Sequence, residues 1–175
     1  SSLSDLLEAH KIQTVAIILR WKESYAVGHG HAPLSNLYES VIFFSWTIIL
    51  IYGLIELKYK YRIIGVFVVP FAFLGMAGAQ LAGTQSFINS GIEPLLPALQ
   101  SNWLLYHVIT CFLAYASFAV ACGISFMYLI KIKKEEAGGD SPAGGILALF
   151  PPCKALDDLN YRAIMIGFPL LTLGI

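Results

Sequence analysis

The sequence predicts an all-α protein, a polytopic transmembrane helix bundle with about four to five spans and both ends truncated. Hydrophobic residues make up 57% of its 175 residues and charged residues only 13%, about half the charged share of an ordinary soluble domain. The apolar residues form runs of about 20, the length that crosses a hydrocarbon core. Eleven basic residues balance eleven acidic ones, which argues against nucleic acid and leaves the lipid bilayer as the expected partner.

Three complete spans are expected at residues 40–57, 63–82 and 103–130, and a fourth begins near Tyr161. The chain lacks an initiator Met and its final apolar run stops at Ile175. We therefore expect both ends to be cuts through a longer protein.

The N-terminal stretch 3–21 is helix-like but contains several charged or polar side chains, including His10 and Lys11. It fits either the end of a cut span, which we favour, or a helix at the membrane surface. His10 is expected to be a solvated surface histidine. The three cysteines lack metal-ligand spacing and are expected to be inert.

Basic residues predict the topology, because short loops rich in Lys and Arg stay in the cytoplasm. They gather in two places, Lys58 to Arg62 and Lys131 to Lys154. The expected organisation is a transmembrane bundle over 1–130 with outer loops at 21–38 and 83–102, a cytoplasmic linker and the start of an amphipathic helix over 131–155, and the end of that helix with a truncated last span over 156–175.

His107 is the residue most in need of an explanation, because an imidazole in an apolar helix needs a partner. It lies 24 residues before Lys131, about 36 Å away at helical rise, and so belongs to the outer interface. Trp103 precedes it by one turn and can stack on a planar ring. The rest of this helix face is mostly small, which permits close approach either of a flat ligand or of another helix. Interfacial Trp and His are also ordinary membrane anchors, and composition alone favours that explanation.

A second group of candidates lies at residues 28–40, directly before the first complete span. Ser35 or Asn36 can cap the following helix, with Tyr38 and Glu39 in its first turn. Helix capping does not explain His29 and His31. Such a pair can chelate a metal, but the sequence offers no further ligand with suitable spacing nearby, which argues against a dedicated zinc or copper site.

Three segments carry a family resemblance. They are GHAPLSNLYES at 30–40, PALQSNWLLYHV at 97–108 and LDDLNYRAIMIGFPLLTLGI at 156–175. In this order and spacing they closely resemble the CcsA/ResC family of cytochrome c biogenesis proteins, and the similarity runs through nearly all of the chain from Arg20 onward.

The resemblance implies a membrane subunit that binds exported heme at its extracytoplasmic face and presents it for thioether attachment to apocytochrome c, at a Cys-x-x-Cys-His segment. It implies that His107 is an axial ligand of the b-type heme iron, beside Trp103, and that His31, Asn36, Tyr38 and Glu39 form an outer-loop motif. No ligand role transfers to His31.

The resemblance also implies a CcsB/ResB-type partner subunit, fused or separate, and a bacterial inner membrane or a thylakoid membrane. The family's Trp-rich heme motif, second external histidine and membrane histidine are expected after Ile175. This chain would therefore supply at most one iron ligand. It offers no acid, base or nucleophile, so the term enzyme, as in cytochrome c synthase, suits only the whole assembly.

Two alternatives remain open at this point. In a multi-pass transporter or channel, His107 would gate an outer vestibule and the loop with His29 and His31 would be a lid; against it, no span carries a midplane carboxylate or cation. In a structural membrane subunit without heme, His107 would be an anchor at the interface.

Overall fold

The computed structural model describes residues 3–85, 90–92, 94, 100–137 and 149–175. These residues are almost entirely helical and contain no strand, which confirms the predicted all-α membrane bundle. The helices are α1 (Leu3–Ala26), α2 (Leu37–Tyr59), α3 (Ile64–Thr84), α4 (Asn102–Ala137) and α5 (Cys153–Gly174). Three of them, α2, α3 and the Asn102–Glu136 part of α4, are long and apolar enough to cross a membrane. Their positions agree with the three complete spans expected from the sequence.

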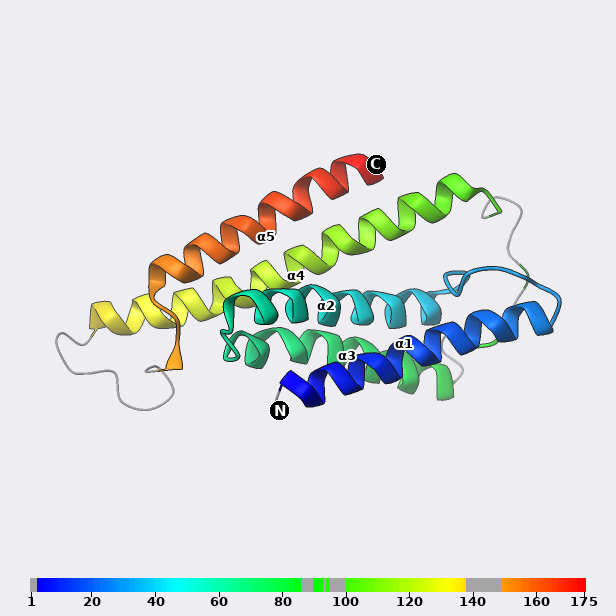
Figure 1. Cartoon of the computed structure of the whole chain (residues 1–175), viewed down its shortest axis with the longest axis horizontal. Helices are drawn as coiled ribbons and strands as arrows, with labels where there is room; N and C mark the ends of the chain where they lie inside the picture. Colours follow the sequence, from blue (N-terminus) through cyan, green and yellow to red (C-terminus); the bar gives the residue numbers. More distant parts are fainter. Residues whose placement is uncertain (1–2, 86–89, 93, 95–99, 138–148) are drawn as a thin grey trace.

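Successive helices run in opposite directions (Figure 1). The segment between α1 and α2 therefore lies at the same end of the molecule as the end of α3 and the start of α4. The short turn between α2 and α3 lies at the opposite end, together with the end of α4 and the start of α5. The two expected outer loops thus share one end and the lysine-rich segments share the other, although parts of the 83–102 loop lie outside the described residues.

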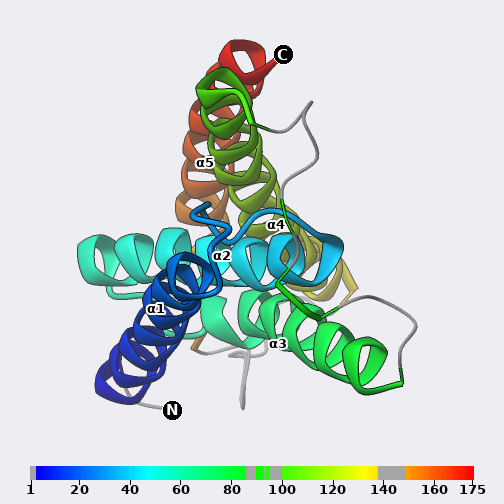
Figure 2. The same ribbon diagram turned by 90° about the vertical axis from the view of Figure 1, so that its right-hand side faces the viewer.

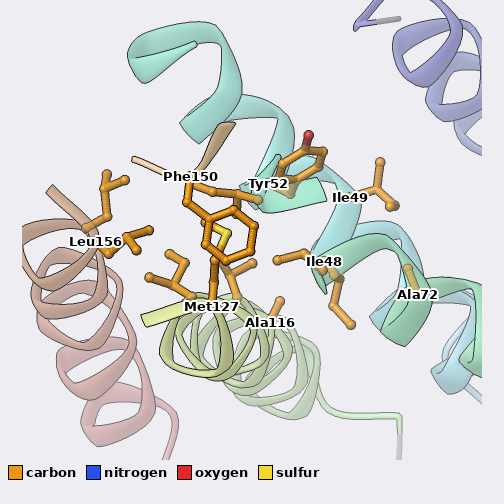
Figure 3. Close-up of a cluster of buried hydrophobic side chains, with 13 residues drawn as sticks. Ile48, Ile49, Tyr52, Ala72, Ala116, Met127, Phe150 and Leu156 are labelled. Atoms are coloured by element: carbon orange, nitrogen blue, oxygen red, sulfur yellow. The ribbon is translucent and has the colours of Figure 1, made fainter. Parts of the chain in front are cut away.

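The main apolar core lies toward the lysine-rich end, where side chains of α2, α3, α4 and α5 meet (Figure 3). Ile48 and Tyr52 of α2 face Met127 of α4 and Leu156 of α5, and Phe150 packs onto this cluster from the segment before α5. These side chains stabilise the folded state through dispersion and close packing, which are lost on unfolding. The core therefore fixes these four helices relative to one another at this end.

Helices α4 and α5 form the most extensive helix pair, and Figure 2 shows them extending away from α2 and α3 toward the C-terminus. Two glycines of α5 allow the close approach. A Cβ atom on Gly167 would lie 2.7 Å from the ring of Phe118, and one on Gly174 would lie 2.8 Å from the sulfur of Cys111. Small residues at these contacts bring the helix backbones together.

The boundaries around the expected linker differ from those predicted. Helix α4 continues to Ala137, so the first residues of the 131–155 segment are helical, and 138–148 lie outside the described residues. The expected amphipathic helix and the last span form one continuous helix, α5, because its buried residues make a single stripe along α4. These buried residues are Leu156, Leu159, Ala163, Gly167 and Gly174.

The start of α5 is attached to the end of α4 through a lysine. Lys131 Nζ donates a hydrogen bond to the carbonyl oxygen of Pro151 at 2.6 Å and lies 3.5 Å from that of Phe150. A charged donor makes a stronger hydrogen bond than a neutral one. Lys131 thus holds the two helices together at the lysine-rich end.

Candidate functional site

His107 lies near the start of α4, at the end of the molecule that contains the expected outer loops. Its ring is exposed, and its Nδ1–H donates a hydrogen bond to the backbone carbonyl of Gly174 in α5. A carbonyl oxygen can only accept, so this bond uses the Nδ1–H and leaves Nε2 as the ring nitrogen for another partner. Histidines that bind metals are commonly held in this way.

The helix face below His107 packs against α5 rather than lying open. Cys111, Ala114 and Ala121 are buried, and Cys111 Sγ lies 3.7 Å from the carbonyl oxygen of Gly174. Of the two explanations for this small face, the structure supports the approach of another helix along most of its length. The described residues of α5 cover this face of α4 as far as Cys111.

Trp103 lies on α4, one turn before His107. It is 77% exposed, among the most exposed aromatic side chains of the described residues. An exposed indole and an exposed imidazole one helical turn apart lie on the same face of the helix. The structure therefore leaves both side chains accessible together.

The two expected outer loops are joined by a buried ion pair between Arg20 of α1 and Glu39 of α2. Arg20 Nε donates to Glu39 Oε1 at 2.7 Å, and the Glu39 side chain is only 1% exposed. The second carboxylate oxygen accepts hydrogen bonds from the backbone N and the Oγ of Ser35, at 2.8 and 2.7 Å. Arg20 also donates to the carbonyl oxygen of Ser90 at 2.7 Å. One charge pair thus connects α1, α2 and the segment after α3.

Asn36 and Tyr38 belong to the same network. The Asn36 side chain accepts a hydrogen bond from the Glu39 backbone N at 2.9 Å, which is the N-cap expected from the sequence, and donates to the carbonyl oxygen of Gly91 at 3.0 Å. The Arg20 guanidinium lies 5.4 Å from the centre of the Tyr38 ring, within the range of a cation–π contact. The residues of the outer-loop motif therefore position one another.

His29 and His31 lie in the loop after α1. Their rings are nearly parallel, with centroids 6.5 Å apart. His31 is buried, its backbone N donates to Ser24 Oγ, and its Nδ1–H donates to the carbonyl oxygen of Ala32. Both histidines line a cavity of about 510 Å³ between the end of α1 and the start of α4.

This cavity does not include His107. Its α4 wall is made by Asn102, Leu104, Leu105 and Val108, on another side of the helix. The structure therefore does not bring His31 and His107 together in one site. Within the described residues, no group of three or more His, Cys, Asp and Glu side chains is suitable for a metal ion.

The comparison with known families identifies the family of the chain. Residues 34–175 match the model of the cytochrome C assembly protein family, which is most of the chain. The chain belongs to this family. Among its relatives, the "Cytochrome c biogenesis protein CcsA" of Guillardia theta is 36% identical and aligns over 93% of this chain and 56% of its own length. The proteins of the same name from Chlorella vulgaris and Gloeobacter violaceus are 34% and 31% identical, each over 93% of this chain.

This member of the cytochrome C assembly family spans little more than half the length of the first curated relatives it matches. No solved structure matches it significantly. The family match begins at Leu34 and includes His107, Asn36 and Glu39, whereas α1 lies before it.

Sequence reasoning missed the contributions of α1 to the site. Arg20 and Ser24 hold the two outer loops, but neither forms a local motif with the residues it contacts. The expectation for His10 was wrong. Its ring stacks on Trp46 of α2 with centroids 5.0 Å apart, and its Nδ1 is buried, because α1 packs against α2 over this turn. The clue available in the sequence was the short spacing of His10, Gln13 and Thr14, which form one polar face of a helix.

Proposed function

We propose that the protein containing this chain takes part in cytochrome c maturation. In this proposal it binds exported heme at the extracytoplasmic face of the membrane and presents it for thioether attachment to the Cys-x-x-Cys-His segment of apocytochrome c. The observation that carries the proposal is the state of His107, an exposed imidazole whose Nδ1–H is held by the Gly174 carbonyl. In this orientation Nε2 is the ring nitrogen that can bind heme iron as an axial ligand.

The residues around His107 fit heme as a substrate. Trp103 is exposed one turn away and offers an indole face for contact with the porphyrin. Because α5 covers the α4 face from Cys111 onward, the proposed contact with the ligand lies at His107 and Trp103. The chemistry at the vinyl groups is supplied by heme and by the cysteine thiols of the apocytochrome, and this chain contributes orientation.

The Arg20–Glu39 network has a supporting role in the proposal. It holds the loop of His31 and the segment at Ser90 and Gly91 at the same end of the bundle as His107. One axial ligand comes from this chain. We propose that the other comes from elsewhere in the full-length protein or from its CcsB/ResB-type partner subunit, in a bacterial inner membrane or a thylakoid membrane.

The test is the absorption spectrum of the purified full-length protein. We expect a Soret band typical of two axial imidazoles, lost or shifted in His107→Ala and restored by added imidazole, because free imidazole can occupy the vacated axial position. His29→Ala is the matched control, since His29 lines the cavity that does not include His107. The spectrum of this variant should equal that of the wild type. An unchanged spectrum in His107→Ala, or a well-folded protein without heme, would contradict the proposal.

A further inference from the structure

A second candidate site lies at the opposite end of the bundle, in a groove between α2 and α5. Both helices pack on α4, which lies between them in Figure 1 and forms the floor of the groove. The groove has a volume of about 400 Å³. It lies away from His107 and from the outer cavity, and nothing in the heme proposal uses it.

The walls of the groove are apolar. Ile51, Leu54 and Ile55 come from α2, and Met165 and Ile166 come from α5. Leu54, Met165 and Ile166 are 59%, 53% and 58% exposed, so large hydrocarbon side chains remain uncovered on both sides. Such a surface favours contact with hydrocarbon.

The floor of the groove is buried and contains two small residues. Ser117 of α4 and Ala163 of α5 are 1% and 4% exposed, and the Ser117 hydroxyl is satisfied by the carbonyl oxygen of Leu113. The floor therefore presents no unsatisfied hydroxyl to a ligand. Small side chains at the floor leave space for a chain of methylene groups.

The lysine-rich end of the groove contains two cations from different helices, Lys58 of α2 and Arg162 of α5. None of the described residues that line the groove is acidic, and neither cation forms an ion pair with another described residue. Tyr59 lies beside them, with its ring centroid 5.4 Å from Lys58 Nζ. Positive charge at one end of an apolar groove complements a ligand with an anionic head and a hydrocarbon tail.

We propose that this groove binds an anionic phospholipid. Its phosphate lies between Lys58 and Arg162, and one acyl chain lies along the apolar walls over Ser117 and Ala163. The charge pattern favours a lipid over a protein helix as the occupant, because an apolar helix would leave both cations without a counter-ion. The bound lipid then bridges α2 and α5 at the end where the core also joins them.

The test uses the full-length protein in detergent, titrated with dioleoyl phosphatidylglycerol or with dioleoyl phosphatidylcholine and examined by native mass spectrometry. The two lipids share their acyl chains and differ in net charge. We expect tighter binding of phosphatidylglycerol, and a loss of about 25-fold in its affinity in the double variant Lys58→Gln/Arg162→Gln, about fivefold for each cation. The matched control is Lys133→Gln/Lys134→Gln, which removes two exposed cations from the same end of α4 without altering the groove.

The control separates this site from the general attraction of a positive surface. Equal losses in the two double variants, or equal binding of the two lipids by the wild type, would overturn the proposal. A photoactivatable phosphatidylglycerol should label peptides of α2 and α5; labelling elsewhere, or none because a protein segment covers the groove, would also overturn it. If the double variant does not fold, Ile166→Trp tests the proposal instead, because it fills the apolar groove and keeps both cations. It should lower the affinity for phosphatidylglycerol at least tenfold.

Discussion

The buried ion pair between Arg20 and Glu39 allows a prediction with a magnitude. Glu39→Gln keeps the size of the side chain but replaces one acceptor oxygen with an NH2 group. In the native protein both carboxylate oxygens accept short hydrogen bonds, one from Arg20 and the other from Ser35. The amide oxygen can accept from Arg20 or from the Ser35 backbone N, but not from both; the NH2 group can only donate, for example to the Ser35 hydroxyl. One N–H therefore loses its acceptor, and the guanidinium loses its counter-charge.

Removing one member of a buried ion pair typically costs 3–5 kcal/mol. The Arg20 side chain is 23% exposed, so water can replace part of the lost interaction. We therefore expect Glu39→Gln to lower the free energy of unfolding by about 3 kcal/mol. The exposed pair between Lys11 and Glu8 is the matched control, because its charges also lie 2.7 Å apart while its side chains are 69% and 66% exposed. Glu8→Gln should cost less than about 0.5 kcal/mol.

The assay is reversible unfolding of the full-length protein in mixed micelles, together with a double-mutant cycle in which Arg20→Gln is the second change. We expect a coupling energy of about 2 kcal/mol between the two positions. Hydrogen exchange should also become faster near Ser90 and Gly91, because Arg20 and Asn36 hold their carbonyl groups. Additive effects of the two substitutions, or a cost for Glu39→Gln no larger than that for Glu8→Gln, would refute this reasoning.

Two further predictions concern α5. Gly174→Ala should lower the free energy of unfolding by about 1–3 kcal/mol, because the new methyl group would lie 2.8 Å from the sulfur of Cys111. Gly78→Ala is the control and should be nearly neutral, since its new methyl group would meet no neighbouring atom within 4 Å. Equal thermal stabilities of the two variants would contradict the packing of α5 on α4. Burial and the neighbouring Glu135 carboxylate raise the pKa of the Cys153 thiol, so less thiolate is present at pH 8 and alkylation by iodoacetamide, in a variant without the other cysteines, should be slow. Glu135→Gln should accelerate it, and an unchanged or lower rate would exclude this cause.

Local patterns in the sequence predicted much of the fold. The apolar runs identified α2, α3 and α4 because their length alone distinguishes them from surface helices. The cap at Asn36 was also predictable from a local pattern, because its partner is the backbone N of Glu39 three residues later. The continuity of α5 was not, because its buried stripe has meaning only beside α4.

The site was less predictable, because its defining contacts join distant parts of the chain. Arg20 contacts Glu39 across 19 residues and Ser90 across 70, and His107 contacts Gly174 across 67. The sequence singled out His107 by its polarity in an apolar helix, but its hydrogen-bond partner, Gly174, lies on a different helix and depends on how α5 packs against α4. His10 was misassigned because its contact with Trp46 requires α1 and α2 to pack at a particular rotation.

The attachment of Lys131 to Pro151 has a consequence for protein engineering. The register of α4 against α5 is set at one end by this lysine and at the other by the contact of His107 with Gly174. The number of residues between the two helices therefore does not determine the register, and the entropy of closing a longer connection grows only logarithmically with its length. A fluorescent reporter inserted between residues 138 and 148 should leave His107 in place, which would make the protein visible in living cells without altering its outer end.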